Sequence, residues 1–262
     1  MMYTKEMLTR QLADMGLRPE DTVMMHSSMK AIGPVEGGAD TVLDALMDYF
    51  APGMLLLPTH TWRQMSESYN LFDPAVEPAC VGILPNLFMK RPGVARSLHP
   101  THSMAAWGPR AEEYVRGEEN VTTPCAPEGA WGRLLQEKGK VLLVGVTHAR
   151  NTYIHAVEEM LDVPERLTEK PVAFRIAMPD GSVKDVQVHR HYNPYEPHIS
   201  ERFDKLMEGY FQTGAAIRGK LGDADCILCD CEKLYQVTKR VLGHEINTFI
   251  DVDPIPAAWW QE

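Results

Sequence analysis

The chain has 262 residues, of which 44% are hydrophobic and 24% are charged, so it is long enough to bury one sizeable globular core. Its formal charge is 26 − 36 = −10 and no run of Lys and Arg exceeds two residues, which argues against a nucleic-acid-binding protein. No apolar run is long enough to span a bilayer, and the N-terminal segment is charged and amphipathic, unlike a signal peptide. Since five cysteines make no disulfide framework, we expect a cytoplasmic protein with no membrane partner.

The first half of the chain alternates helical spacing with buried apolar runs. Leu8, Leu12 and Met15 recur at helical intervals before Gly16. Patterns of these two kinds predict, in order, a helix over 4–15, a strand over 21–26, a helix over 40–50, a strand over 53–59 and helices over 81–90, 109–116 and 131–138. Residues 63–80 show neither pattern and are predicted to form a long loop, of the kind that serves as a lid or binding loop.

The segment from Lys140 to Glu159 combines a strand, a turn and a helix. Val141–Val146 is a short apolar run that predicts a buried strand, and a polar turn follows it. Asn151 and the threonine after it can cap a helix in which His155 and Glu158, three residues apart, share one face. Open α/β sheets bind ligands at such junctions, so we predict a proton-transferring histidine here; the alternative is an ordinary solvated helix face.

The last third of the chain is less regular. It is predicted to contain, in order, a β-hairpin of 172–178 and 183–188, an irregular segment over 189–203, a helix over 203–213, a glycine-containing strand within 215–228 and a helix over 232–242. The three histidines of the irregular segment indicate either a metal site or the wall of a polar pocket. Cys226, Cys229 and Cys231 lack a fourth ligand nearby and are predicted to be thiols in a strand. Because no linker divides the chain, we predict a single domain over residues 1–262.

Six stretches together resemble a known family. They are HSSMKAIG with GGA (26–33, 37–39), GMLLLPT (53–59), RSLHP with SMAAWG (96–100, 103–108), LLVGV with NTYIHAVE (142–146, 151–158), HISERF (198–203) and GKLGDA (219–224). In this order they resemble the aminoglycoside 3-N-acetyltransferase family, also called the antibiotic N-acetyltransferase family, over nearly the whole chain. Several such segments in series are far more specific than any one of them.

The resemblance implies a fold and a reaction. The fold is a single α/β domain with a central mixed β-sheet flanked by helices, unlike the GNAT fold. The reaction is direct transfer of the acetyl group of acetyl-CoA to the 3-amino group of the 2-deoxystreptamine ring of an aminoglycoside, which confers antibiotic resistance. An ammonium must lose a proton before it attacks a thioester, and the family's NTxxH histidine, here His155, is the general base, with Glu158 helping to hold the site. The resemblance assigns acetyl-CoA binding to His26, Ser27, Ser28, Lys30, His99 and Ser103.

The expected acceptor is a small cationic amine, and no metal is expected. Strand tips are where α/β sites gather, so His60 and Trp62 are predicted to line the acceptor pocket. The late histidines His189, His191 and His198 are predicted to complete it as a polar pocket wall. A homodimer is a further option. Resistance enzymes of the family often carry carboxylates where this chain has Ala149 and, after the late hairpin, His189 to His191, so we keep a narrower or different acceptor as a hypothesis.

Three alternatives remain open at this stage. The first is an acetyltransferase of the same fold that acts on a different small amine. The second is a non-catalytic module that binds CoA. The third is a metal-dependent hydrolase that uses the histidines at 99, 102, 148, 155, 189, 191 and 198.

Overall fold

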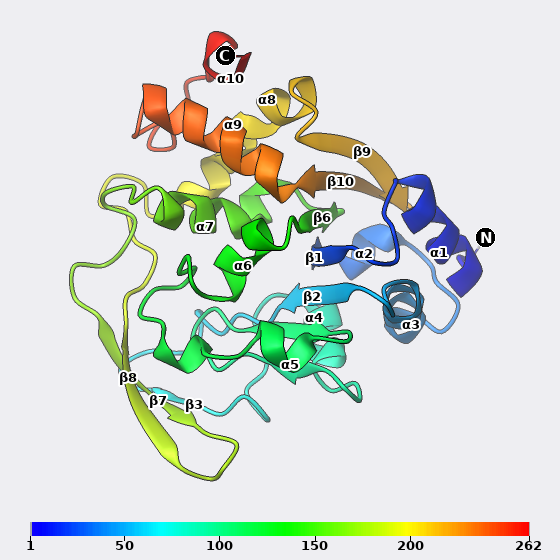
Figure 1. Ribbon diagram of the computed structural model, residues 1–262, viewed down its shortest axis with the longest axis horizontal. Coiled ribbons are helices and arrows are strands. Elements are labelled where there is room, and N and C mark those ends of the chain that lie inside the picture. The colour runs from blue at the N-terminus through cyan, green and yellow to red at the C-terminus, as the bar shows by residue number, and fades with distance from the viewer. Residues whose placement is uncertain (1, 262) are drawn as a thin grey trace.

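The computed structural model describes residues 2–261 and is built around a seven-stranded mixed sheet (Figure 1). The strand order is β4-β5-β2-β1-β6-β10-β9. The strands are β1 (Thr22–Ser27), β2 (Met54–Pro58), β4 (Ala95–Arg96), β5 (Met104–Trp107), β6 (Lys140–Val144), β9 (Ala216–Leu221) and β10 (Ala224–Asp230). The expected α/β fold with a central mixed sheet is confirmed.

The centre of the sheet is parallel and its margins are antiparallel. β1 pairs in parallel with β2 and with β6, whereas the other strand pairs of this sheet are antiparallel. From β1 the chain passes to β2 on one side and later to β6 on the other, so the carboxyl ends of these three strands share one edge. Ligands of open α/β sheets bind where the strand order reverses in this way. The topology therefore marks the edge that follows Ser27, Pro58 and Val144 as the place for a site.

Helices cover both faces of the sheet and form two apolar cores with it. One face carries α1 (Lys5–Asp14), α2 (Met29–Ile32), α3 (Ala39–Tyr49) and α4 (Ile83–Phe88). The opposite face carries α5 (Ala111–Tyr114), α6 (Ala130–Gln136), α7 (Tyr153–Met160), α8 (Met207–Gln212), α9 (Cys231–His244) and α10 (Ala258–Gln261). Short 3₁₀ helices are η1 (Glu118–Asn120), η2 (His148–Arg150) and η3 (Ile199–Leu206).

The apolar runs divide between the two cores because successive side chains of a strand point to opposite faces. In β6, Val141 and Leu143 pack against the α6 and α7 side, whereas Leu142 and Val144 pack against the α1 and α3 side. Both sets are fully buried, which confirms the expectation that this strand is covered on both faces. The same alternation in β1 places His26 on the face of Met24, where α6 lies.

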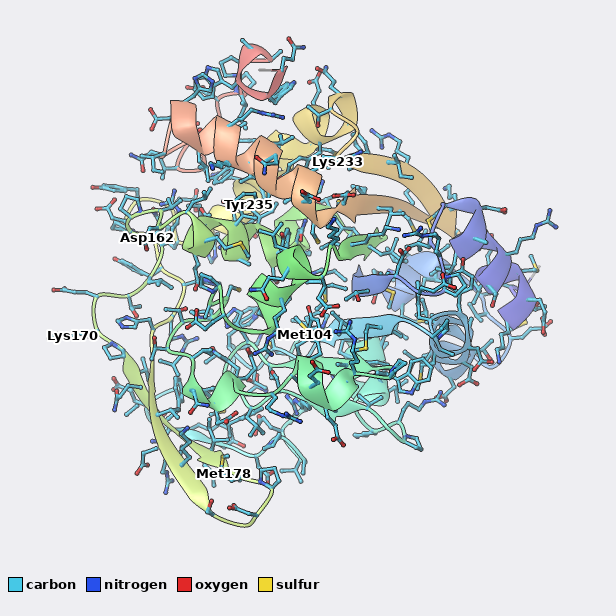
Figure 2. The ribbon with its side chains drawn as sticks, viewed as in Figure 1. Met104, Asp162, Lys170, Met178, Lys233 and Tyr235 are labelled. Atoms are coloured by element: carbon cyan, nitrogen blue, oxygen red, sulfur yellow. The ribbon has the colours of Figure 1, made fainter. Side chains whose placement is uncertain are left out.

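A second sheet of three strands lies at the opposite end of the molecule from α8, α9 and α10 (Figure 1). It consists of β3 (Leu71–Phe72), β7 (Val172–Ala177) and β8 (Val183–Val188), and Met178 lies near the tip of its long ribbon (Figure 2). The predicted hairpin is thus confirmed. The loop predicted over 63–80 contains β3, which pairs in parallel with β7, because Phe72 packs into a small core with Phe174 and Ile176.

Two predictions near the C-terminus differ from the structure. The single glycine-containing strand expected within 215–228 is two antiparallel strands, β9 and β10, because the chain turns at Gly222, whose φ is +60°. The segment over 189–203 was predicted to be too irregular for a core element, but η3 brings Phe203 into the core, where it is fully buried.

The cysteine cluster predicted to be thiols in a strand is buried. Cys226 and Cys229 lie in β10, and Cys231 begins α9. All three side chains are at most 2% exposed, and burial raises the pKa of the Cys226 thiol to about 12.

Among residues 2–261, no helix is both long and apolar enough to cross a membrane.

Glu118 gives a prediction about stability and pH. Its side chain is 2% exposed and accepts a hydrogen bond from Ala130 N, at the start of α6, at 2.6 Å. Burial raises the pKa of Glu118 from 4.5 to about 7, so the folded protein holds this proton more tightly than the unfolded chain. The free energy of unfolding should therefore fall as the pH rises from about 4.5 to about 7, by about 3 kcal/mol in total from this group.

The substitution Glu118→Gln keeps the acceptor oxygen and removes the titration. Urea unfolding at pH 5 and pH 8 should show a smaller loss of stability in this variant than in the wild type, while the exposed control Glu112→Gln should behave as the wild type. An unchanged loss of stability in Glu118→Gln would contradict the assignment.

Candidate active site

A cavity of about 590 Å³ opens at the carboxyl edge of β2, β1 and β6. Its walls include the ends of these strands, namely Ser27 and Pro58, with Val146 just beyond β6. Further wall residues come from the segments 60–63, 80–85, 149–155 and 190–200. The cavity therefore lies at the edge where the sheet topology places a ligand site.

The turn after β6 delivers α7 to this cavity. Gly145 has a φ of +62°, and a Cβ there would meet Ala31 Cβ at 2.2 Å, so only glycine lets α2 pack against the strand end. Asn151 Oδ1 then accepts a hydrogen bond from Tyr153 N at 3.2 Å, which supports the predicted helix start. The Thr152 hydroxyl makes no capping bond and instead lies 3.2 Å from His60 Nε2. His155 follows in the first turn and lines the cavity.

His155 and Glu158 form a hydrogen-bonded pair. His155 Nδ1 lies 2.9 Å from Glu158 Oε2, and Arg166 Nε donates to Glu158 Oε1 at 2.6 Å. Glu158 has no exposed surface, so the alternative of a solvated helix face is wrong. Because the carboxylate only accepts hydrogen bonds, it fixes the proton of the imidazole on Nδ1. Nε2 of His155 has no partner among residues 2–261 and is left as the basic nitrogen.

A second histidine–carboxylate pair lies beside the first. His191 Nε2 lies 3.0 Å from Glu159 Oε1, and the His191 ring stacks on the His155 ring with centroids 4.0 Å apart. Phe203 of η3 meets the His155 ring edge-on at 4.8 Å. Two ring contacts and one buried carboxylate therefore hold the orientation of the His155 ring.

Four buried imidazoles of the cavity wall, His26, His60, His102 and His191, have pKa values lowered by burial. His26 and His60 stack on Trp131, at centroid distances of 6.1 and 5.5 Å, and His60 also contacts His102 at 4.7 Å. Burial lowers the pKa of His26 to about 3 and holds the pKa values of His60, His102 and His191 well below the ordinary value. These rings consequently add polar, neutral surface to the cavity.

Of the residues predicted to bind acetyl-CoA, the structure brings two to the cavity wall. His26 and Ser27, at the end of β1, line it. Ser28 and Lys30 are not among its lining residues: Ser28 N donates to Val144 O at 2.9 Å, and Lys30 is exposed on α2.

His99 and Ser103 also lie outside the cavity lining. His99 is fully buried, its Nδ1 accepts from His102 N at 2.9 Å, and its Nε2 lies 3.1 Å from Thr123 O. Ser103 Oγ donates to Thr59 O at 2.7 Å. These two side chains hold together the loops behind the cavity.

Four of the five residues predicted for the acceptor pocket line the cavity. His60, Trp62, His191 and His198 do so, and Trp62 is 39% exposed. His189 does not, because its Nδ1 hydrogen-bonds to Thr168 O at 2.7 Å. Arg190 and His191, the next two residues along the chain, both line the cavity.

The histidines of the metal-dependent alternative are not gathered as one ligand set. His148 bonds to Asn151 and packs on the Tyr210 ring at 4.9 Å, outside the cavity lining. Within residues 2–261, the group of metal-ligating side chains with donor atoms within 4.8 Å of one another is Cys125, Glu159 and His191, which shares only His191 with that alternative.

Sequence reasoning missed several residues of the site. Arg166 is the buried ion-pair partner of Glu158, and Glu159 is the hydrogen-bond partner of His191. Trp131 is the ring on which two imidazoles stack. Glu159 follows Glu158 directly, so a second acidic residue one position along α7 was a visible signal. Arg166 and Trp131 come from remote segments and carry no local motif.

Three comparisons relate the chain to known proteins. The family model described as aminoglycoside 3-N-acetyltransferase matches residues 24–243. Aminoglycoside N(3)-acetyltransferase IX of Micromonospora chalcea is 28% identical over 255 residues, which cover 88% of this chain and 90% of the relative.

Solved structures agree with the sequence matches. A variant of aminoglycoside acetyltransferase AAC(3)-IVa in complex with gentamicin superposes on this chain with a TM-score of 0.83 at 26% identity. The superposition covers 100% of this chain and 98% of that variant. The structure of AAC-IIIb with CoASH, at 23% identity and a TM-score of 0.78, covers 90% of this chain and 94% of its own and shows the shared fold. Because the family model spans most of the chain, the protein belongs to the aminoglycoside 3-N-acetyltransferase family.

Proposed function

We propose that the protein transfers the acetyl group of acetyl-CoA directly to an amino group of an aminoglycoside, the 3-amino group of 2-deoxystreptamine, with antibiotic resistance as the consequence. The observation that carries the proposal is His155, a cavity-lining imidazole whose Nδ1 is held by the buried carboxylate of Glu158. Family membership, the relatives named as N(3)-acetyltransferases and the gentamicin complex at 26% identity support it.

The proposed chemistry needs only groups of this chain and the two substrates. His155 Nε2 accepts a proton from the attacking amine as its nitrogen bonds to the thioester carbonyl carbon. The tetrahedral intermediate collapses, the C–S bond breaks, and the imidazolium returns the proton to the departing sulfur. The products are the acetamide and CoASH. Ser27 and Thr152, which line the same cavity, carry hydroxyl groups that can donate to the oxyanion.

A cavity of about 590 Å³ accommodates the thioester end of acetyl-CoA beside an amine, and its open mouth leaves the nucleotide outside. We assign His26 and Ser27 to the part of the cavity that binds acetyl-CoA, because they end β1 and line the same cavity as His155. Ser28, Lys30, His99 and Ser103 remain proposals for acetyl-CoA binding, as do His60, Trp62, His189, His191 and His198 for the amine.

A thiol-release assay tests the proposal. Acetyl-CoA is offered with gentamicin, apramycin, kanamycin or a simple diamine, and free CoASH is measured. We expect release with at least one 2-deoxystreptamine drug, and NMR of the product should show acetylation at the 3-amino group. Acetyl-CoA that binds without being consumed with any amine would favour the non-catalytic alternative.

The assembly and location follow as further parts of the proposal. We propose one domain over residues 1–262 that works in the cytoplasm, in keeping with five free cysteines. A homodimer stays a prediction. Light scattering at micromolar concentration, which measures the molar mass of the protein in solution, tests it.

A further inference from the structure

The charges of the cavity wall have one sign. Its lining residues, as far as residues 2–261 show, include Arg63, Arg150 and Arg190 and contain no Asp, Glu or Lys. This contrasts with the chain as a whole, whose formal charge is −10. A positive cavity in an acidic protein is a local arrangement and does not follow from the composition.

Two of the arginines meet at Trp62. Arg190 donates from Nη2 to Trp62 O at 2.5 Å and from Nη1 to Met65 O at 3.0 Å, so backbone carbonyls hold the guanidinium and leave its charge without a carboxylate. The Arg63 guanidinium lies 5.5 Å from the centroid of the Trp62 ring. Arg150, just after the β6 turn, is exposed and makes no side-chain hydrogen bond or ion pair among the described residues.

The carboxylates of the segments that line the cavity have partners elsewhere, although Glu159 Oε2 is buried without a hydrogen-bond partner among residues 2–261. Glu158 is bound by His155 and Arg166, and Glu159 by His191 and Cys125 N. Asp204 accepts hydrogen bonds from Thr147 Oγ1 and Ala149 N. Glu196 is paired with Arg202. None of these carboxylates is among the lining residues described, so a ligand in the cavity meets the three guanidinium groups together with imidazole rings.

Such a wall binds anionic oxygens. A guanidinium offers a fork of donors that matches a carboxylate or a phosphate, and an unpaired guanidinium gains most from one. We infer that, besides aminoglycosides, the cavity accepts a second class of acceptor: small primary amines that also carry a carboxylate or phosphate group. The amine then faces His155 while the anionic group is bound by Arg150, alone or with Arg63, since the Arg190 guanidinium already donates to two backbone carbonyls. This inference rests on the proposed acetyl transfer and extends its range of acceptors.

The competing use of the arginines is the phosphates of acetyl-CoA. Both uses need a cationic wall. They are distinguished by whether removing an arginine changes the kinetic constants for the acceptor or those for acetyl-CoA. Loss of a contact to the acceptor lowers kcat/KM for the anionic amine. Loss of a contact to the cosubstrate raises the KM of acetyl-CoA with every acceptor.

Matched acceptors test the inference by CoASH release. Glucosamine, glucosamine 6-phosphate and muramic acid share an amino sugar and differ in having no anion, a phosphate or a carboxylate. We expect kcat/KM for at least one anionic sugar to exceed that for glucosamine by about tenfold or more. In Arg150→Gln, or in the double variant Arg63→Gln/Arg150→Gln, this ratio should fall toward one. The control Arg10→Gln removes an exposed charge from α1 and should keep the ratio.

Two results would overturn the inference. One is a wild-type ratio near one for both anionic sugars; the other is a ratio that survives both arginine variants while the KM of acetyl-CoA rises. If aminoglycosides are acetylated in either case, the proposed acetyl transfer stands and only this inference fails. If no amine at all releases CoASH, the acetyl transfer itself fails.

Discussion

Replacement of His155 by alanine is expected to lower kcat for acetyl transfer by about 10²- to 10⁴-fold, the usual contribution of a positioned general base. The acceptor amine must lose a proton to attack the thioester, and His155 is a cavity-lining imidazole with a buried carboxylate on Nδ1 and a free Nε2. Release of CoASH at saturating acetyl-CoA and acceptor measures the effect.

The control for this prediction is His244→Ala. His244 is also an imidazole on an aromatic ring, since it stacks on Trp259 with centroids 5.3 Å apart, but it lies at the end of α9. The variant His244→Ala should keep the wild-type rate of acetyl transfer. Calorimetric titration should show that His155→Ala still binds CoASH, because the ring is assigned to proton transfer. Near-wild-type turnover by His155→Ala would remove this residue as the base.

Replacement of Arg166 by methionine is expected to destabilise the fold by about 3–5 kcal/mol, the typical cost of leaving one member of a buried ion pair alone. Glu158 and Arg166 have side chains 0% and 2% exposed, and the N–O distance between them is 2.6 Å. The guanidinium also donates to Ile246 O at 3.1 Å, which ties the segment after α9 to the site. Urea unfolding compares the variant with the wild type.

Two further variants show whether the loss comes from the uncompensated carboxylate. The double variant Glu158→Gln/Arg166→Met should recover part of the stability, because a neutral amide is cheaper to bury than an unpaired charge. Arg10→Met breaks only an exposed pair with Asp14, 3.9 Å apart, and should cost less than about 1 kcal/mol. A loss below about 1 kcal/mol in Arg166→Met would contradict the prediction.

The parts of the site that could be predicted are those with local chemistry. The spacing of His155 and Glu158 fixes them on one face of α7, and the structure joins them by a 2.9 Å contact. The strand tips at His26, His60 and Trp62 also reach the cavity, since parallel strands end at one edge. His99 and Ser103 were assigned to acetyl-CoA binding by the resemblance alone, and the sequence did not show that the packed loops would supply hydrogen-bond partners for their polar atoms.

The strands of the fold also differ in whether the sequence alone could predict them. Continuous apolar runs indicated β1, β2 and β6, because a strand covered on both faces has no polar side to show. β3 could not be seen, since two residues have no periodicity and Leu71–Phe72 become a strand only by pairing with β7, about a hundred residues away. The turn that separates β9 from β10 was missed because the segment holds two glycines, Gly219 and Gly222, and a glycine also fits a strand interior.

By itself, the sequence determined most helices, the central strands and the histidine that faces its carboxylate one helical turn away, because these depend on contacts between near neighbours or on patterns along a single segment. The family and its α/β fold came from the resemblance of six stretches in series. The tertiary structure decided which polar groups are free to act. It brought Arg166 to Glu158, stacked His191 on His155, and left the guanidinium groups of Arg63, Arg150 and Arg190 around a cavity that no carboxylate of residues 2–261 lines. Burial and pairing depend on segments far apart in the chain, so the charge of the cavity is a property of the folded protein alone.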